Sequence, residues 1–100
     1  MNGQIYTIEQ IKNCLIPVFA QYPVKKAVLF GSYVKGQASE KSDIDILVDS
    51  GLRGLSFYGL LEDVVTQLDK PVDLLDVSQL AKGSKLQNEI QKEGIVIYEQ

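Results

Sequence analysis

The chain has 100 residues, of which 45% are hydrophobic and 23% are charged, and its formal net charge is −3. This length suits one hydrophobic core, so we expect residues 1–100 to form a single domain. The near-average composition argues against a disordered or fibrous chain. The longest uncharged stretch, residues 13–24, contains two prolines and is too short to cross a membrane. The acidic balance also argues against direct binding of nucleic acid through charge.

Two residue types that often carry chemistry are scarce. The sequence contains no histidine and a single cysteine, Cys14. These counts argue against a histidine base and against a zinc site. One cysteine cannot form an internal disulfide, which fits a cytoplasmic protein. Any catalysis must therefore use carboxylates, hydroxyl groups, backbone amides or a hard cation.

The first predicted element is a helix over residues 7–22. Its apolar residues recur at spacings of three and four, which is the pattern of one helical face. Thr7 and Gln10 have the spacing of a capping box. Pro17 lies inside the pattern, so we expect it to kink or divide the helix.

Two strands are predicted next, over residues 24–30 and 43–48. The first ends in four apolar residues, Ala27 to Phe30, a run typical of a strand buried on both faces. It is followed by Gly31-Ser32, and ten residues then separate Ser32 from Asp43. This spacing allows the two strands to be neighbours in one sheet.

The remaining elements complete an α/β pattern. We expect a helix over residues 56–70 capped by Ser56, a strand over 72–76, a short helix over 86–93 ended by Gly94, and a last strand over 94–98. The order α-β-β-α-β-α-β predicts a mixed sheet of about four strands. Its helices should pack mainly on one face and leave the other face open.

Three aspartates in these strands are the candidate catalytic and metal-binding residues. Asp43 and Asp45, two positions apart, should share one strand face about 7 Å from each other. Carboxylates this close on a half-buried surface repel each other unless a cation lies between them, and oxygen ligands select Mg²⁺, Mn²⁺ or Ca²⁺. Asp73 can complete the cluster if its strand lies beside the second one, whereas Asp76 should project to the opposite face. An edge strand with solvated acids is the alternative interpretation.

The Gly31-Ser32 turn is the candidate phosphate site. Glycine lets the backbone approach a ligand closely, and exposed N–H groups at such a turn suit a phosphate. An ordinary turn is the alternative. Three carboxylates beside a phosphate-binding turn predict phosphoryl or nucleotidyl transfer with two metal ions.

These residues resemble a known family. Gly31-Ser32, ten residues and Asp43-Ile44-Asp45 are similar to the GSx10DxD signature of the DNA polymerase β-like nucleotidyltransferases. The surrounding residues, the segment Pro71-Val-Asp-Leu and the closing Glu-Gly-Ile-Val-Ile-Tyr resemble the small prokaryotic MNT branch. The resemblance extends over nearly the whole chain.

The resemblance implies a fold, a site and a partner. It implies that Gly31 and Ser32 bind the phosphates of ATP, that Asp43 and Asp45 bind two Mg²⁺ ions, and that Asp73 completes a metal site and helps to activate the attacking hydroxyl. It further implies an antitoxin that transfers AMP to a tyrosine of a HEPN-domain toxin, a separate chain with which it would form a hetero-oligomer. A non-catalytic antitoxin that neutralises its partner by occlusion is the first alternative. A two-chain enzyme that modifies small molecules is the second.

Two residues next to the turn, Lys35 and Tyr33, could also lie near a bound nucleotide. Lys35 stands where many relatives have arginine, and lysine keeps the charge but loses the bidentate geometry. We therefore expect a solvated Lys35 and not a phosphate contact. Tyr33 is a candidate for stacking on the base of the nucleotide.

Overall fold

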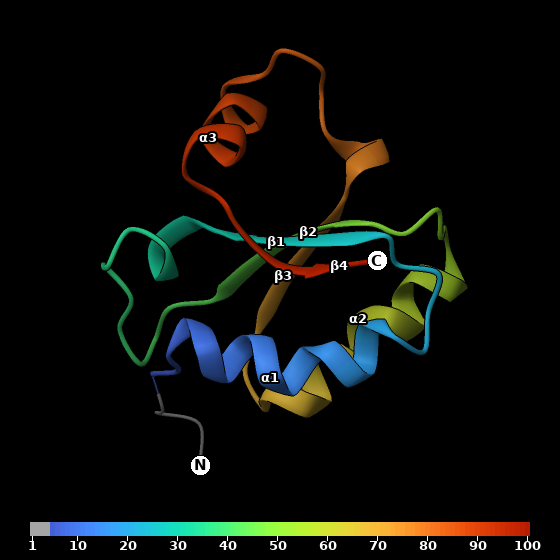
Figure 1. Cartoon of the computed structure of the whole chain (residues 1–100), viewed down its shortest axis with the longest axis horizontal. Coiled ribbons are helices and arrows are strands. Elements are labelled where there is room, and N and C mark those ends of the chain that lie inside the picture. Colours follow the sequence, from blue (N-terminus) through green and yellow to red (C-terminus); the bar gives the residue numbers. More distant parts are fainter. Residues whose placement is uncertain (1–4) are drawn as a thin grey trace.

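A four-stranded sheet forms the centre of the fold, with helices on both of its faces (Figure 1). The computed structural model of the chain describes residues 5–100. The predicted order of helices and strands is confirmed, and their bounds are α1 (Ile8–Phe19), β1 (Lys26–Phe30), β2 (Ile44–Asp49), α2 (Leu55–Leu68), β3 (Val72–Asp76), α3 (Lys85–Glu93) and β4 (Ile95–Glu99). Two 3₁₀ turns, Gly31–Tyr33 and Val77–Gln79, follow β1 and β3.

The sheet is mixed, as predicted. Its strand order is β3-β2-β1-β4, and β1 is antiparallel to both of its neighbours. β2 and β3 are parallel because α2 carries the chain back between them. This pairing places Asp45 of β2 directly opposite Asp73 of β3.

The two faces of the sheet have different covers. On the first face the fully buried Ile44, Ile46 and Val48 of β2 pack into the main core with α1 and α2. On the second face Leu47 packs with Phe30 of β1 and Ile90 of α3 in a smaller cluster. Figure 1 shows α1 and α2 below the sheet and the short α3 above it. Helices therefore lie mainly on the first face, and the second face is partly open beside α3.

The start of α1 follows the prediction, but its middle does not. The Gln10 N–H donates to Thr7 Oγ1 at 3.0 Å and the Thr7 N–H donates to Gln10 Oε1 at 2.8 Å, which is the expected capping box. Of the two predicted effects of Pro17, a kink or a division, the division is wrong, because α1 continues through Pro17 to Phe19. The helix ends only two residues later, so proline removes one backbone hydrogen bond close to a terminus.

The ends of α2 also differ from the prediction. The helix begins at Leu55 after Gly54, whose φ of 59° is accessible to glycine, so Ser56 lies within the first turn and is not the cap. It ends at Leu68, where Asp69 adopts a left-handed conformation with a φ of 51°. Within residues 5–100 no helix, the 14-residue α2 included, has the length and apolar character of a membrane span.

Candidate active site

The three predicted acids gather at one end of the second face. Asp45 lies in β2 beside its register partner Asp73, and Asp43 immediately precedes β2. Asp43 and Asp73 are exposed, while Asp45 is half-buried. Neither of the two ion pairs formed among residues 5–100 involves these acids. The acids therefore lack a basic partner on the described part of the chain.

The electrostatics of Asp45 reflect this missing partner. The pKa of the Asp45 carboxyl is raised to about 6, first by burial and then by the negative charges of nearby acids, namely Asp73, Asp43 and Glu89. A cation among the acids would relieve this repulsion, and carboxylate oxygens are the ligands that Mg²⁺ prefers. Charge and donor type thus fit a hard cation. Among residues 5–100, however, no three acidic or cysteine side chains are close enough to hold one ion as they stand, so these acids would have to turn toward a bound cation.

We expect Asp45→Asn to stabilise the metal-free chain at pH 7. The folded-state pKa of about 6 exceeds the ordinary 3.8, so folding opposes ionisation of this carboxyl. Stability should therefore fall as pH rises from about 4 to about 6, and the full cost should persist above that window. After discounting for solvent screening, the cost is about 1 kcal/mol. Urea unfolding in EDTA between pH 4 and 7 should show this slope in the native chain and a flatter profile in the variant.

The Gly31-Ser32 turn lies directly against Asp45. Phe30, the last residue of β1, is the register partner of Asp45, so the turn begins beside that acid. Gly31 has a φ of +80°, and a Cβ built on it would lie 2.2 Å from Asp45 Oδ2. The N–H groups of Val34 and Lys35 both donate to the Gly31 carbonyl, at 3.1 and 3.2 Å, and close the turn. The sheet thus brings the predicted phosphate turn and the predicted acids together.

The segment from the turn to Asp43 is fastened by Lys70, a residue that the sequence reasoning missed. The Lys70 side chain is buried, with 3% exposure, and its ammonium donates to the Glu40 carbonyl at 2.8 Å. The Ile44 N–H donates to the Pro71 carbonyl at 3.2 Å close by. These bonds hold the approach to Asp43 against the start of β3. No local pattern marked Lys70, since its role depends on contact across 30 residues.

Lys35 is exposed, as expected, but it also forms an ion pair that the sequence did not indicate. Its ammonium lies 3.1 Å from Glu89 Oε2 on α3, and this hydrogen bond and the Glu89 charge raise the Lys35 pKa. Glu89 is a second residue that the sequence reasoning missed. Its proximity to the turn becomes visible only when α3 folds back over the second face.

The structure argues against the candidate role of Tyr33 in base stacking. Its side chain is buried and belongs to the main core under the sheet. In the 3₁₀ turn Gly31–Tyr33, Gly31 contacts Asp45 while Tyr33 points into the core. Tyr33 is therefore not available for stacking on a bound base.

Asp76 has a structural role, as its predicted orientation suggested. It lies on the opposite face of β3 from Asp73 and is buried, with 3% exposure. The N–H and hydroxyl groups of Ser50 donate to its Oδ1 at 3.0 and 2.6 Å, and those of Ser78 donate to Oδ2 at 3.0 and 2.7 Å. Burial alone would raise the Asp76 pKa, but these four bonds outweigh it and lower the pKa.

We expect Asp76→Ala to lower the free energy of unfolding by about 2–4 kcal/mol, because it leaves several donors without their charged acceptor. Asp73→Ala is the matched control on the same strand. Asp73 is exposed and repels Asp45, so its removal should change stability by less than about 0.5 kcal/mol or stabilise slightly. Urea unfolding at pH 7 compares the two. Equal losses would contradict the division of these acids into structural and site residues.

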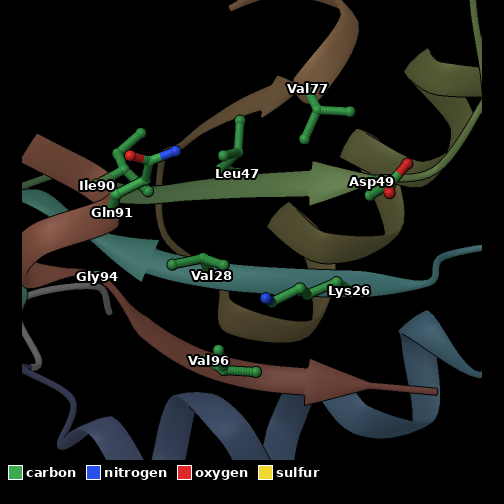
Figure 2. Close-up of a pocket in the computed structure, with 9 residues that line it drawn as sticks. All are labelled: Lys26, Val28, Leu47, Asp49, Val77, Ile90, Gln91, Gly94 and Val96. Carbon is green, nitrogen blue, oxygen red and sulfur yellow. The ribbon is translucent and has the colours of Figure 1, made fainter. Parts of the chain in front are cut away.

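A separate pocket of about 350 Å³ lies elsewhere on the second face. Figure 2 shows its apolar floor on three neighbouring strands, with α3 at one end and two charged residues, Lys26 and Asp49, toward the other. The lining residues are Lys26, Val28, Leu47, Asp49, Val77, Ile90, Gln91, Gly94 and Val96. None of the predicted site residues lines it. The acids and the glycine turn therefore lie outside this pocket.

The chain also matches known proteins over most of its length. The family model described as polymerase beta, nucleotidyltransferase, matches residues 13–100. The chain belongs to this family. This chain is 38% identical over 85 residues to the protein adenylyltransferase MntA of Thermococcus cleftensis. The aligned region covers 77% of this chain and 84% of that relative.

Solved structures give the same fold. A toxin–antitoxin structure with AMP-PNP matches the nucleotidyltransferase with a TM-score of 0.76 and 26% identity, over 89% of this chain and 73% of the other. A tri-AMPylated Shewanella oneidensis HEPN toxin in complex with MNT antitoxin matches with a TM-score of 0.70 and 23% identity, over 93% and 73% of the two chains. The second likeness concerns the fold alone. These matches agree with the polymerase β-like fold that the sequence motifs imply.

Proposed function

We propose that the chain is a Mg²⁺-dependent protein adenylyltransferase that transfers AMP from ATP to a tyrosine of a HEPN-domain toxin and so acts as its antitoxin. The observation that carries the proposal is the pairing of Asp45 with Asp73 beside the Gly31 turn, in a chain of the nucleotidyltransferase family. The relative named protein adenylyltransferase supports the reaction. The toxin–antitoxin structure with AMP-PNP supports a toxin as the partner and an adenine nucleotide as the substrate.

In this proposal the acids bind metal ions and the turn binds phosphates. Asp43, Asp45 and Asp73 would hold two Mg²⁺ ions, which when bound neutralise phosphate charge and stabilise the leaving group. The backbone N–H groups of Gly31 and Ser32, with the Ser32 hydroxyl, would hold the phosphates.

The transfer itself exchanges one phosphorus–oxygen bond for another. The tyrosine oxygen bonds to the α-phosphorus, the bond between that phosphorus and the bridging oxygen breaks, and pyrophosphate leaves. The exposed Asp73 carboxylate accepts the hydroxyl proton. The product is a tyrosine that carries AMP through a phosphodiester bond.

The position of a radioactive label in ATP tests this reaction. The full chain is incubated with Mg²⁺, a HEPN-domain toxin as the candidate partner, and ATP labelled on the α- or the γ-phosphorus. We expect the α-label on the partner and the γ-label in released pyrophosphate. The γ-label on the partner would indicate a kinase. A stable complex that carries neither label would contradict transfer and favour neutralisation by occlusion.

A further inference from the structure

The Gly31 turn and α3 are joined by one ion pair. Lys35 follows the turn, and its backbone N–H is fixed to the Gly31 carbonyl at 3.2 Å. Its ammonium lies 3.1 Å from Glu89 Oε2, and the two side chains retain 37% and 36% of their surface exposed. The other ion pair among residues 5–100, Lys26 with Glu99 at 4.0 Å, lies at the far end of β1. The Lys35–Glu89 pair is thus the one at the rim of the acidic site.

Glu89 is held in place by the packing of α3. The next residue, Ile90, is buried with Phe30 and Leu47 on the second face of the sheet. At the end of the helix Gly94 packs so closely that a Cβ would lie 2.6 Å from Val28 Cγ1. Both contacts fix α3 against β1, so the Glu89 carboxylate has a defined position near the turn. Its charge also acts on Asp45.

We propose that Glu89 holds Lys35 at the rim of the site until a nucleotide binds, and that Lys35 then exchanges Glu89 for the phosphates of ATP. This inference rests on the proposed function and adds one nucleotide-binding residue, Lys35, to the proposed site. Glu89 is a positioning residue in this scheme, because it acts on the nucleotide through Lys35.

Breaking the Lys35–Glu89 ion pair should cost little free energy. A partly exposed ion pair contributes little net stability, since solvent screens it and its side chains lose freedom. A triphosphate offers several negative oxygens where Glu89 offers one carboxylate, and lysine reaches them through a flexible four-carbon stem. The backbone of Lys35 is already fixed to the turn, so only its side chain has to move.

Nucleotide affinity in a set of variants tests the exchange. Calorimetry on the full chain with Mg²⁺ measures the Kd for ATP, and adenosine serves as a probe that lacks phosphates. Lys35→Met should raise the Kd for ATP about tenfold, as expected for loss of a charge-assisted phosphate contact. Lys35→Arg should retain most of the affinity. Glu89→Gln should lower the Kd about threefold by releasing Lys35. None of the variants should change the Kd for adenosine.

The double variant Lys35→Met/Glu89→Gln separates release of Lys35 from simple loss of a negative charge. We expect it to bind ATP like Lys35→Met, because the benefit of Glu89→Gln requires the lysine. A benefit that persists without Lys35 would overturn the proposal, and so would an unchanged Kd in Lys35→Met. Equal weakening of ATP and adenosine would indicate a structural role and would also overturn it.

Weaker ATP binding in Glu89→Gln would instead identify Glu89 as a ligand of the nucleotide complex and overturn the exchange. If the native chain does not bind ATP, both the proposed function and the role of Lys35 are wrong. If it binds ATP and the Lys35 variants bind equally well, only the role of Lys35 is wrong.

Discussion

Asp45→Asn is expected to slow AMP transfer by about a thousandfold while the chain remains folded. Asp45 is the half-buried member of the acid group and touches both the Asp73 register position and the Gly31 turn. Asparagine keeps the shape but removes the charge that would hold a cation against the phosphates. Loss of roughly 4 kcal/mol of transition-state stabilisation corresponds to this factor. A time course of AMP incorporation into the partner measures it.

Asp49→Asn is the matched control for this prediction. Asp49 lies on the same strand and the same face, is also half-buried, and is four residues from Asp45 at the opposite end of β2. Its register partner is Lys26 and not an acid or the glycine turn. Transfer by this variant should stay within about twofold of the native rate. Similar losses in both variants would mean that the acidic end of β2 is not the site.

Gly31→Ala is expected to lower activity about a hundredfold, with a smaller effect on stability. The new methyl carbon would lie 2.2 Å from Asp45 Oδ2, far inside van der Waals contact, so the carboxylate would have to move. Because that carboxylate is the end of a side chain, it can rotate away at modest cost, but it then leaves the position next to the turn. The φ of +80° adds about 1–2 kcal/mol of strain for any residue other than glycine. Displacement of one charged group from a site of this kind typically costs about 10²-fold or more.

Gly36→Ala separates strain from displacement. Gly36 has a similar φ of +72°, but a Cβ there would meet nothing within 4 Å. It should therefore lose a similar amount of stability and keep nearly full activity. Urea unfolding and the transfer assay are compared for both variants. If Gly31→Ala transfers AMP as fast as Gly36→Ala, the contact between the turn and Asp45 has no catalytic importance.

The positions of the acids follow from rules that act along a single strand. Alternation of side chains puts Asp73 and Asp76 on opposite faces of β3 and predicts the different surroundings that the structure shows for them. The apolar runs predicted the number of strands, and the ten-residue gap allowed β1 and β2 to pair. The sequence could not show that β3 lies next to β2, and the sheet order in the structure decides this.

The residues that were missed or misplaced depend on contacts between distant segments. Glu89 reaches Lys35 because α3 packs back onto the second face, and Lys70 reaches Glu40 because a loop folds against β3. Tyr33 turns inward because a 3₁₀ turn, whose geometry the sequence did not reveal, directs it to the core. Local periodicity carries no signal for any of these placements.

Intact mass of the partner tests the central claim most directly. The native chain and an Asp43→Ala/Asp45→Ala variant are each incubated with Mg²⁺, ATP and the HEPN-domain protein, and both proteins are weighed by mass spectrometry. We expect one or more added AMP units on the partner with the native chain and none with the variant, although the variant still binds the partner. AMP addition by the variant, or an unmodified partner in a stable complex with the native chain, would contradict the central claim.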